Sequence, residues 1–267
     1  MRSWTICFAA VVSLLFTGEF KMLLAAEASE PLVLTVTTVA LDGKARNEFA
    51  AKEPIWVRVS LENVSDRKVS GWCSGEKGYG VEIEPNKDSK DRTHAVDGDR
   101  QGVVSNKVFR PMNLEPKAKF TFDVLLADWL NVTGEGAVNL QATLGLMDEK
   151  WHPIQVRTAF SFTLKGQLDK KGLDALLKSV QVLYSSDAVA DRIRAVDSVR
   201  AIRVPDLLPL LAKAIADKDE ILQYHAVQSL LVLPYPEVIP ILKKALESTD
   251  PAVRAVAKNE LDRREKH

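Results

Sequence analysis

The side chains best suited to catalysis in this sequence are one thiol, one imidazole and one carboxylate within a loop-rich stretch. Cys73, His94 and Asp97 could form a nucleophile, a general base and the group that orients the base. No recognisable nucleophile signature surrounds them, and the sequence lacks a phosphate-binding Gly-Lys loop, a GxSxG elbow and a dinucleotide fingerprint. We therefore predict no catalytic residues, and a protein that is not an enzyme.

Acidic side chains in the same stretch partly match a calcium-binding loop. Residues 97–102, DGDRQG, place oxygen ligands first and third and a glycine sixth, but Val108 stands twelfth, where a bidentate Glu is required. Two cysteines are too few for a Cys-rich zinc site. The four histidines are scattered without metal-ligand spacing: His94, His152, His225 and His267. We predict neither a metal nor a cofactor.

Tryptophan side chains offer another kind of chemistry, the stacking of a flat ring on a sugar or a peptide. Trp56 alternates with Ile55 and Val57, so its ring could face solvent; alternatively, it covers a sheet face or packs under a neighbouring loop. The candidate ligand or partner contacts are Trp56, Trp72 and Trp129. Asn63 and Asn131 each begin a glycosylation acceptor sequence, which matters only where exported proteins are glycosylated.

Charge and the first residues limit the environment of the protein. Lys+Arg and Asp+Glu both number 36 in 267 residues, so the chain lacks the net positive field that nucleic-acid binding normally uses. Arg2, the apolar stretch 6–16 and the small residues Ala26 and Ala28 predict a signal peptide over residues 1–28. We expect an exported protein, periplasmic or extracellular, whose mature chain does not span a membrane; the alternative is an uncleaved N-terminal anchor.

Residues 29–165 carry the pattern of β-strands. Apolar residues alternate with mostly polar ones at 55–62, and similar alternation recurs around 120–124, 138–144 and 156–164. Segments with turn residues such as Pro116 and Gly134 separate these runs. About seven strands with one apolar face each predict an antiparallel β-sandwich.

This region resembles the immunoglobulin-like modules of exported bacterial proteins. The resemblance rests on residues 55–63, IWVRVSLEN, a strand ending at a polar turn, and on 114–120, LEPKAKF, a Pro-containing corner. The Cys…Trp…Cys signature of true immunoglobulin domains is absent. The resemblance implies an architecture and no activity.

Residues 166–267 change to a helical period and repeat themselves. The segment 205–211, PDLLPLL, is matched 31 residues later by 236–242, PEVIPIL, and the same offset relates Ala195, Ala226 and Ala257. Three helix pairs of this kind predict a short α-solenoid, because one pair alone cannot bury its apolar face. Asp206 and Glu237 are expected to cap the first helix of their pairs.

The helical part resembles HEAT repeats of the short kind also seen in phycobilisome-lyase-like proteins. The run 250–257, DPAVRAVA, carries the best match, whereas the middle unit has Glu220 for the proline and Gln223 for the arginine. What the family implies is protein–protein interaction or scaffolding.

Two hypotheses of function follow from these features. The first is an exported, non-catalytic interaction or scaffold protein that binds another exported or envelope protein through the helical-repeat surface. The alternative is carbohydrate or cell-envelope binding through the β-sandwich, with Trp56 and the long 71–106 loop as its motivation. We expect two separately folding domains with a boundary near 165–167, and a sandwich that docks against the first helix to cap the short solenoid.

Overall fold

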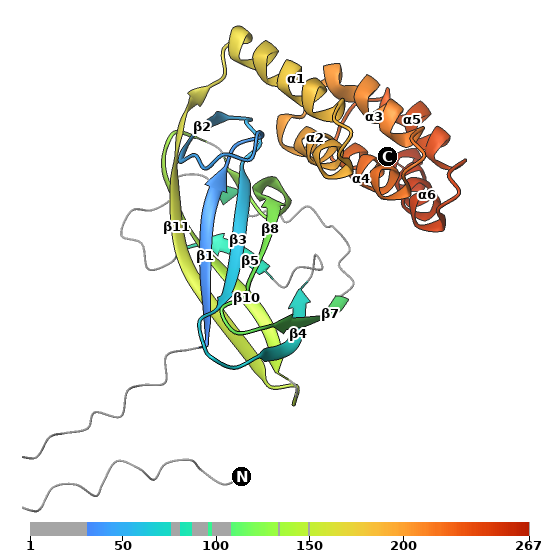
Figure 1. The fold of residues 1–267 in the computed structure, drawn as a ribbon. Helices are drawn as coiled ribbons and strands as arrows, with labels where there is room; N and C mark the ends of the chain where they lie inside the picture. The colour runs from blue at the N-terminus through green and yellow to red at the C-terminus, as the bar shows by residue number, and fades with distance from the viewer. Residues whose placement is uncertain are drawn as a thin grey trace, which may run out of the picture. The chain divides into compact units, whose positions relative to one another are not determined.

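The computed structural model describes residues 31–75, 81–86, 96–97, 108–132, 134–148 and 150–266. Residues 32–267 form one compact unit, the second of two into which the chain divides. The predicted signal peptide, His94, and residues 76–80, 87–95 and 98–106 of the predicted 71–106 loop lie outside the described residues, as do the side chains of Cys73 and Asp97. The loop prediction is wrong for residues 71–75 and 81–85, which lie in strands. Both the strands and the helices described below belong to the second unit (Figure 1).

Two sheets form the first half of this unit, which confirms the predicted β-sandwich class. One has the order β1-β3-β8 and the other the order β2-β11-β10-β4-β7, with β5 also pairing with β10. β2 and β11 run parallel, whereas the other pairs among the described strands are antiparallel. The strands are β1 Leu32–Val39, β2 Glu48–Ala51, β3 Trp56–Asn63, β4 Val69–Gly75, β5 Val81–Pro85, β7 Val108–Leu114, β8 Lys119–Leu125, β10 Gly136–Asp148 and β11 Pro153–Gln167. A separate short pair consists of β6 Val96–Asp97 and β9 Asn131–Val132.

The alternation of the sequence decides which side of each strand is buried. In β3, Val57, Val59 and Leu61 are fully buried in one core. From the other sheet, Leu140 and Leu144 of β10 join the same core. Alternate residues of a strand point to opposite faces, so each sheet has one apolar face and the two faces pack together.

The helices follow β11 and form three pairs, which confirms the predicted helical repeats. They are α1 Lys170–Tyr184, α2 Val189–Ile202, α3 Leu208–Ile215, α4 Glu220–Leu230, α5 Val238–Ala245 and α6 Pro251–Glu265. Ala195, Ala226 and Ala257, one on each second helix, are all fully buried in a continuous core. Small residues at these positions let successive second helices approach closely.

The helix caps differ from the prediction. A 3₁₀ turn at Pro205–Leu207 precedes α3, and neither Asp206 nor Glu237 makes a side-chain cap bond. The capping expectation for these two residues is therefore wrong, because neither side chain reaches a free N–H group. Side-chain caps form instead at α4, where Asp219 Oδ1 accepts from Leu222 N at 3.0 Å, at α6, where Asp250 Oδ1 accepts from Ala252 N at 2.8 Å, and at α1, where Asp169 Oδ1 accepts from Gly172 N at 2.7 Å.

Two adjacent residues of α4 provide a test of this stack. Leu222 is fully buried, whereas Ile221 is 61% exposed. We expect Leu222→Ala to lower the free energy of unfolding by about 3 kcal/mol, and Ile221→Ala to change it by no more than about 0.5 kcal/mol. Urea unfolding monitored by far-ultraviolet circular dichroism gives both values. Equal losses for the two variants would contradict the assigned packing of α4.

Candidate functional site

The turns inside the helix pairs are built in the same way three times. Ser186, Asp217 and Ser248 are spaced by 31 residues, and each side-chain oxygen accepts a bond from the backbone N–H two residues later. Such local side-chain-to-backbone bonds favour a turn over continued helix. The three turns therefore lie along one edge of the stack in a regular series.

Side chains from the second helices tie each turn to the next. Arg192 Nη1 donates to Asp217 Oδ2 at 2.6 Å. At the equivalent position of the following unit, Gln223 Nε2 donates to Asp217 O and Gln223 Oε1 accepts from Ser248 Oγ, both at 2.5 Å. The replacement of arginine by Gln223 therefore keeps the contact between turns while removing its charge.

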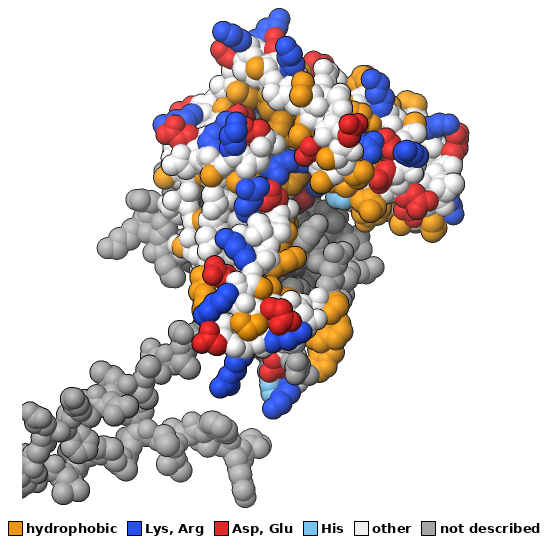
Figure 2. Space-filling view, in the orientation of Figure 1, with side chains coloured by type: hydrophobic (Ala, Val, Ile, Leu, Met, Phe, Trp, Pro, Cys, Tyr) orange, Lys and Arg blue, Asp and Glu red, His pale blue; other side chains and the backbone are white. Residues whose placement is uncertain are grey.

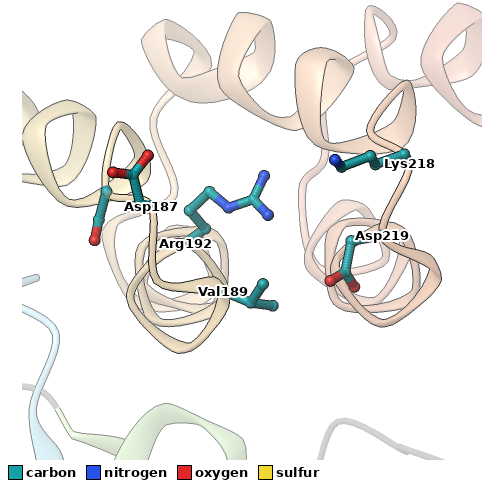
Figure 3. Close-up of a pocket in the computed structure, with 6 residues that line it drawn as sticks. Asp187, Val189, Arg192, Lys218 and Asp219 are labelled. Carbon is teal, nitrogen blue, oxygen red and sulfur yellow. The ribbon is translucent and has the colours of Figure 1, made fainter.

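A polar hollow of about 570 Å³ opens between the first two turns. It is lined by Ser186, Asp187, Val189, Arg192, Lys218 and Asp219. Figure 3 shows the side chains of Arg192 and Lys218 extending toward one another across this hollow. Because both acidic and basic groups line it and Arg192 is already paired, the hollow suits a polar partner segment or water better than a small apolar ligand.

An exposed apolar surface lies on the second helices, and we call it the second-helix surface. Ile221 and Tyr224 of α4 lie one turn apart, and they are 61% and 37% exposed. The residues at the same places in the neighbouring repeats are Ala190 and Ile193 on α2 and Ala252 and Ala255 on α6. Figure 2 shows hydrophobic side chains gathered along the lower edge of the helical part. The two large side chains at the centre of this surface therefore have alanine at three of the four equivalent positions beside them, and Ile193 at the fourth.

One helix of the stack, α2, also packs against the sandwich. Trp56, Val39 and Leu125 are cross-strand neighbours on the outer face of the β1-β3-β8 sheet, and Ala201 of α2 packs against them. Trp56 Nε1 donates to Ser198 Oγ at 3.3 Å. The sandwich therefore contacts the second helix of the first pair, and the expectation that it docks on the first helix is wrong in this detail.

Charged groups surround this contact. Asp123 accepts from Arg58 of the neighbouring strand at 2.8 and 2.9 Å, and from Arg194 of α2 at 2.7 Å. Burial alone would raise the pKa of the Asp123 carboxyl, but the bonds from Arg58 and Arg194 outweigh burial, and the pKa lies below its usual value. Next to this group, Arg200 bridges Asp128 of the sandwich and Asp197 of its own helix.

The structure separates the three candidate tryptophans. Trp56 is only 5% exposed, and the guanidinium of Arg194 lies 4.4 Å from the centre of its ring. α2 therefore covers the ring, so the alternative in which Trp56 packs against neighbouring structure holds and the ring is not available for stacking on a ligand. Trp129 packs against the sandwich core, whereas Trp72 stacks on Trp151 with ring centroids 5.6 Å apart. The three residues do not form one site.

The described residues contain neither an accessible glycosylation site at Asn63 nor a metal-binding cluster nor a membrane-spanning helix. The Asn63 side chain is fully buried and donates to the carbonyl oxygens of Arg67, Leu114 and Glu115, so it is not available for glycosylation in this fold. Among the described residues there is no group of three side chains placed to hold a metal ion. The same part of the chain contains no helix with the length and apolar character needed to cross a bilayer.

Comparison with known families agrees with the repeat geometry. Residues 163–262 match the family model for HEAT repeats. This match covers α1 to α5 and most of α6 and supports the HEAT-repeat assignment of this part of the chain, whereas the similarity to phycobilisome-lyase-like proteins stays a prediction. No curated protein matches the chain.

Solved structures resemble the chain only distantly. One is the CARDB domain of a Pyrococcus furiosus protein in complex with di-metal ions, 13% identical over 51% of this chain and 94% of that chain, with a TM-score of 0.28. Another is the PmoD soluble domain from Methylocystis sp., 12% identical over 49% of this chain and 90% of that chain, with a TM-score of 0.24. Native alpha-2-macroglobulin from Escherichia coli is 10% identical over 86% and 41%, with a TM-score of 0.29. At these TM-scores the likeness indicates nothing about function.

The charged contact makes stability depend on pH in a defined direction. The pKa of Asp123 is lower in the folded protein than in the unfolded chain. The ionised carboxylate therefore adds to the free energy of unfolding in full at pH values above the unfolded pKa of about 3.9, and this stabilisation is lost as pH falls through the folded pKa. We expect Asp123→Asn to destabilise the protein by on the order of 2 kcal/mol at pH 7 and by much less at pH 2.5. Urea unfolding at both values measures this. Glu62→Gln, a substitution of an acidic residue in the neighbouring strand, is the control, and a pH-independent cost of Asp123→Asn would contradict the assignment.

Proposed function

We propose that this protein is an exported, non-catalytic interaction or scaffold protein that binds another protein through its helical repeats. The observation that carries the proposal is the exposure of Ile221 and Tyr224 side by side at the centre of the second-helix surface. Exposed apolar side chains that cluster are typical of interaction sites, and tyrosine is among the residues that contribute most to binding. Export rests on the predicted signal peptide at residues 1–28.

The contacts around the second-helix surface favour a preformed binding site. His225 Nδ1 lies 2.8 Å from Asp197 Oδ1 of α2, and the Tyr224 ring lies edge-on against the His225 ring. Asp197 is in turn paired with Arg200. These contacts connect the Tyr224 region to α2 and limit its movement, so a partner would bind with a small loss of conformational entropy.

Trp56 is not available to bind a carbohydrate, because its ring is buried under α2. The polar hollow between the turns lies on the same repeats as the second-helix surface and provides charged groups that a partner could also contact. A protein partner with an apolar centre and polar margins fits this combination better than a small molecule does.

The test is affinity capture by the tagged full-length protein from its own envelope or secreted fraction. We expect the double variant Ile221→Ala/Tyr224→Ala to bind the captured partner at least roughly 30-fold more weakly, since hot-spot side chains contribute about 2 kcal/mol. The control is Val182→Ala, which shortens an exposed apolar side chain on α1 that lies outside the second-helix surface. Unchanged binding by the double variant, or equal loss in the control, would contradict the proposed surface.

A further inference from the structure

The tip of the β10–β11 hairpin holds a tryptophan in an unusual backbone conformation. Trp151 has φ of +64°, in the left-handed region that bulky residues rarely occupy because it is strained for them. A hydrogen-bonded turn fixes this conformation. Asp148 Oδ1 accepts from Lys150 N at 2.8 Å and from His152 N at 2.7 Å, and Trp151 N donates to Asp148 O at 3.0 Å.

The same turn keeps its carboxylate ionised. The backbone N–H of His152, followed by its side chain and the N–H of Lys150, lowers the pKa of Asp148 below its usual value. His152 Nδ1 lies 3.0 Å from Asp148 Oδ2. The charged carboxylate therefore accepts from three groups and stabilises the turn that places Trp151 at the surface.

Strand β4 pairs with β10 close to the tip of this hairpin. Gly71 and Trp72 pair with Asp148 and Met147 of β10. A Cβ atom at Gly71 would lie 2.3 Å from the carbonyl oxygen of Met147, so only glycine permits this approach. The approach brings Trp72 next to the hairpin tip, where its ring stacks on Trp151 with 11° between the ring planes. Two separate backbone constraints thus create one aromatic pair.

The pair presents a flat apolar surface with polar groups at its margin. Trp151 is 56% exposed, and Ile154, three residues later on β11, is also exposed. The side chains of Lys150 and His152, on either side of Trp151 in the turn, are both exposed and can donate hydrogen bonds. A surface this rigid and flat suits a ligand that is itself flat, with apolar C–H groups on its face and hydroxyl groups around its edge.

We propose that the Trp72–Trp151 pair is a binding platform for the pyranose rings of a polysaccharide. A sugar ring would lie against the exposed part of the Trp151 indole, while Lys150 and His152 would bond its peripheral hydroxyl groups. The inference is independent of the proposed function, because the platform lies on the sandwich and shares no residue with the second-helix surface. It predicts that the protein holds a polysaccharide by one part and a protein by the other.

The experiment measures binding of the full-length protein to insoluble cellulose, chitin and peptidoglycan, with titration of cellohexaose and chitohexaose followed by tryptophan fluorescence. We expect at least one polymer to retain the protein. Trp151→Asn should weaken retention about tenfold or more, because asparagine tolerates the left-handed backbone but provides no ring. Phe120→Thr removes another exposed aromatic side chain, on β8, and should bind as the wild type does.

Three outcomes would overturn the platform. The first is a wild-type protein that no polymer retains, and the second is a Trp151→Asn variant that binds as tightly as the wild type. The proposal would also be overturned if Trp151→Asn abolished binding of an envelope protein and left polysaccharide binding unchanged, because the pair would then be a protein contact. The Ile221→Ala/Tyr224→Ala variant should keep polysaccharide binding, so failure of this inference and failure of the proposed function are distinguishable.

Discussion

The contact between helix α2 and the outer face of the β1-β3-β8 sheet is the constraint on which the described structure depends. A single helix pair cannot cover its own apolar face, and three pairs make a short stack. α2 is buried on both sides: Val199 and Ile202 face the repeat core, whereas Arg194 and Ser198 contact the sandwich. The bonds from Arg58 and Arg194 offset the free energy lost when the Asp123 carboxylate is removed from water. Without these partners, burial of the charged carboxylate would destabilise the contact.

Much of the fold could be predicted because it depends on periodicity. Alternation around Val57 and Val59 identified the buried side of β3, and the 31-residue offset of Ala195, Ala226 and Ala257 identified the three helix pairs. The parallel pairing of β2 with β11 was missed, since the four residues of β2 are too few for a pattern to emerge. Asp206 was expected to cap a helix, but periodicity does not reveal that a 3₁₀ turn precedes α3 there.

The candidate sites were harder to predict, because they depend on which residues meet in space. Alternation placed Trp56 on the outer face of its sheet correctly but contained no information about the helix that covers it. The 31-residue offset places Ile221 and Tyr224 where the neighbouring repeats have mostly smaller residues. This difference could have indicated an interaction surface on α4 from the sequence alone. Nothing in the sequence indicated that Trp151 adopts a positive φ, since that depends on the bonds to Asp148.

The most direct test of this account is a double-mutant cycle between Asp123 of the sandwich and Arg194 of α2. The unfolding free energies of the wild type, Asp123→Asn, Arg194→Gln and the double variant give the coupling between the two side chains. If α2 is fixed to the sandwich as described, the coupling is about 1 kcal/mol or more. A coupling within about 0.3 kcal/mol of zero would show that the two side chains do not interact in solution, and it would contradict the arrangement on which the rest of the account depends.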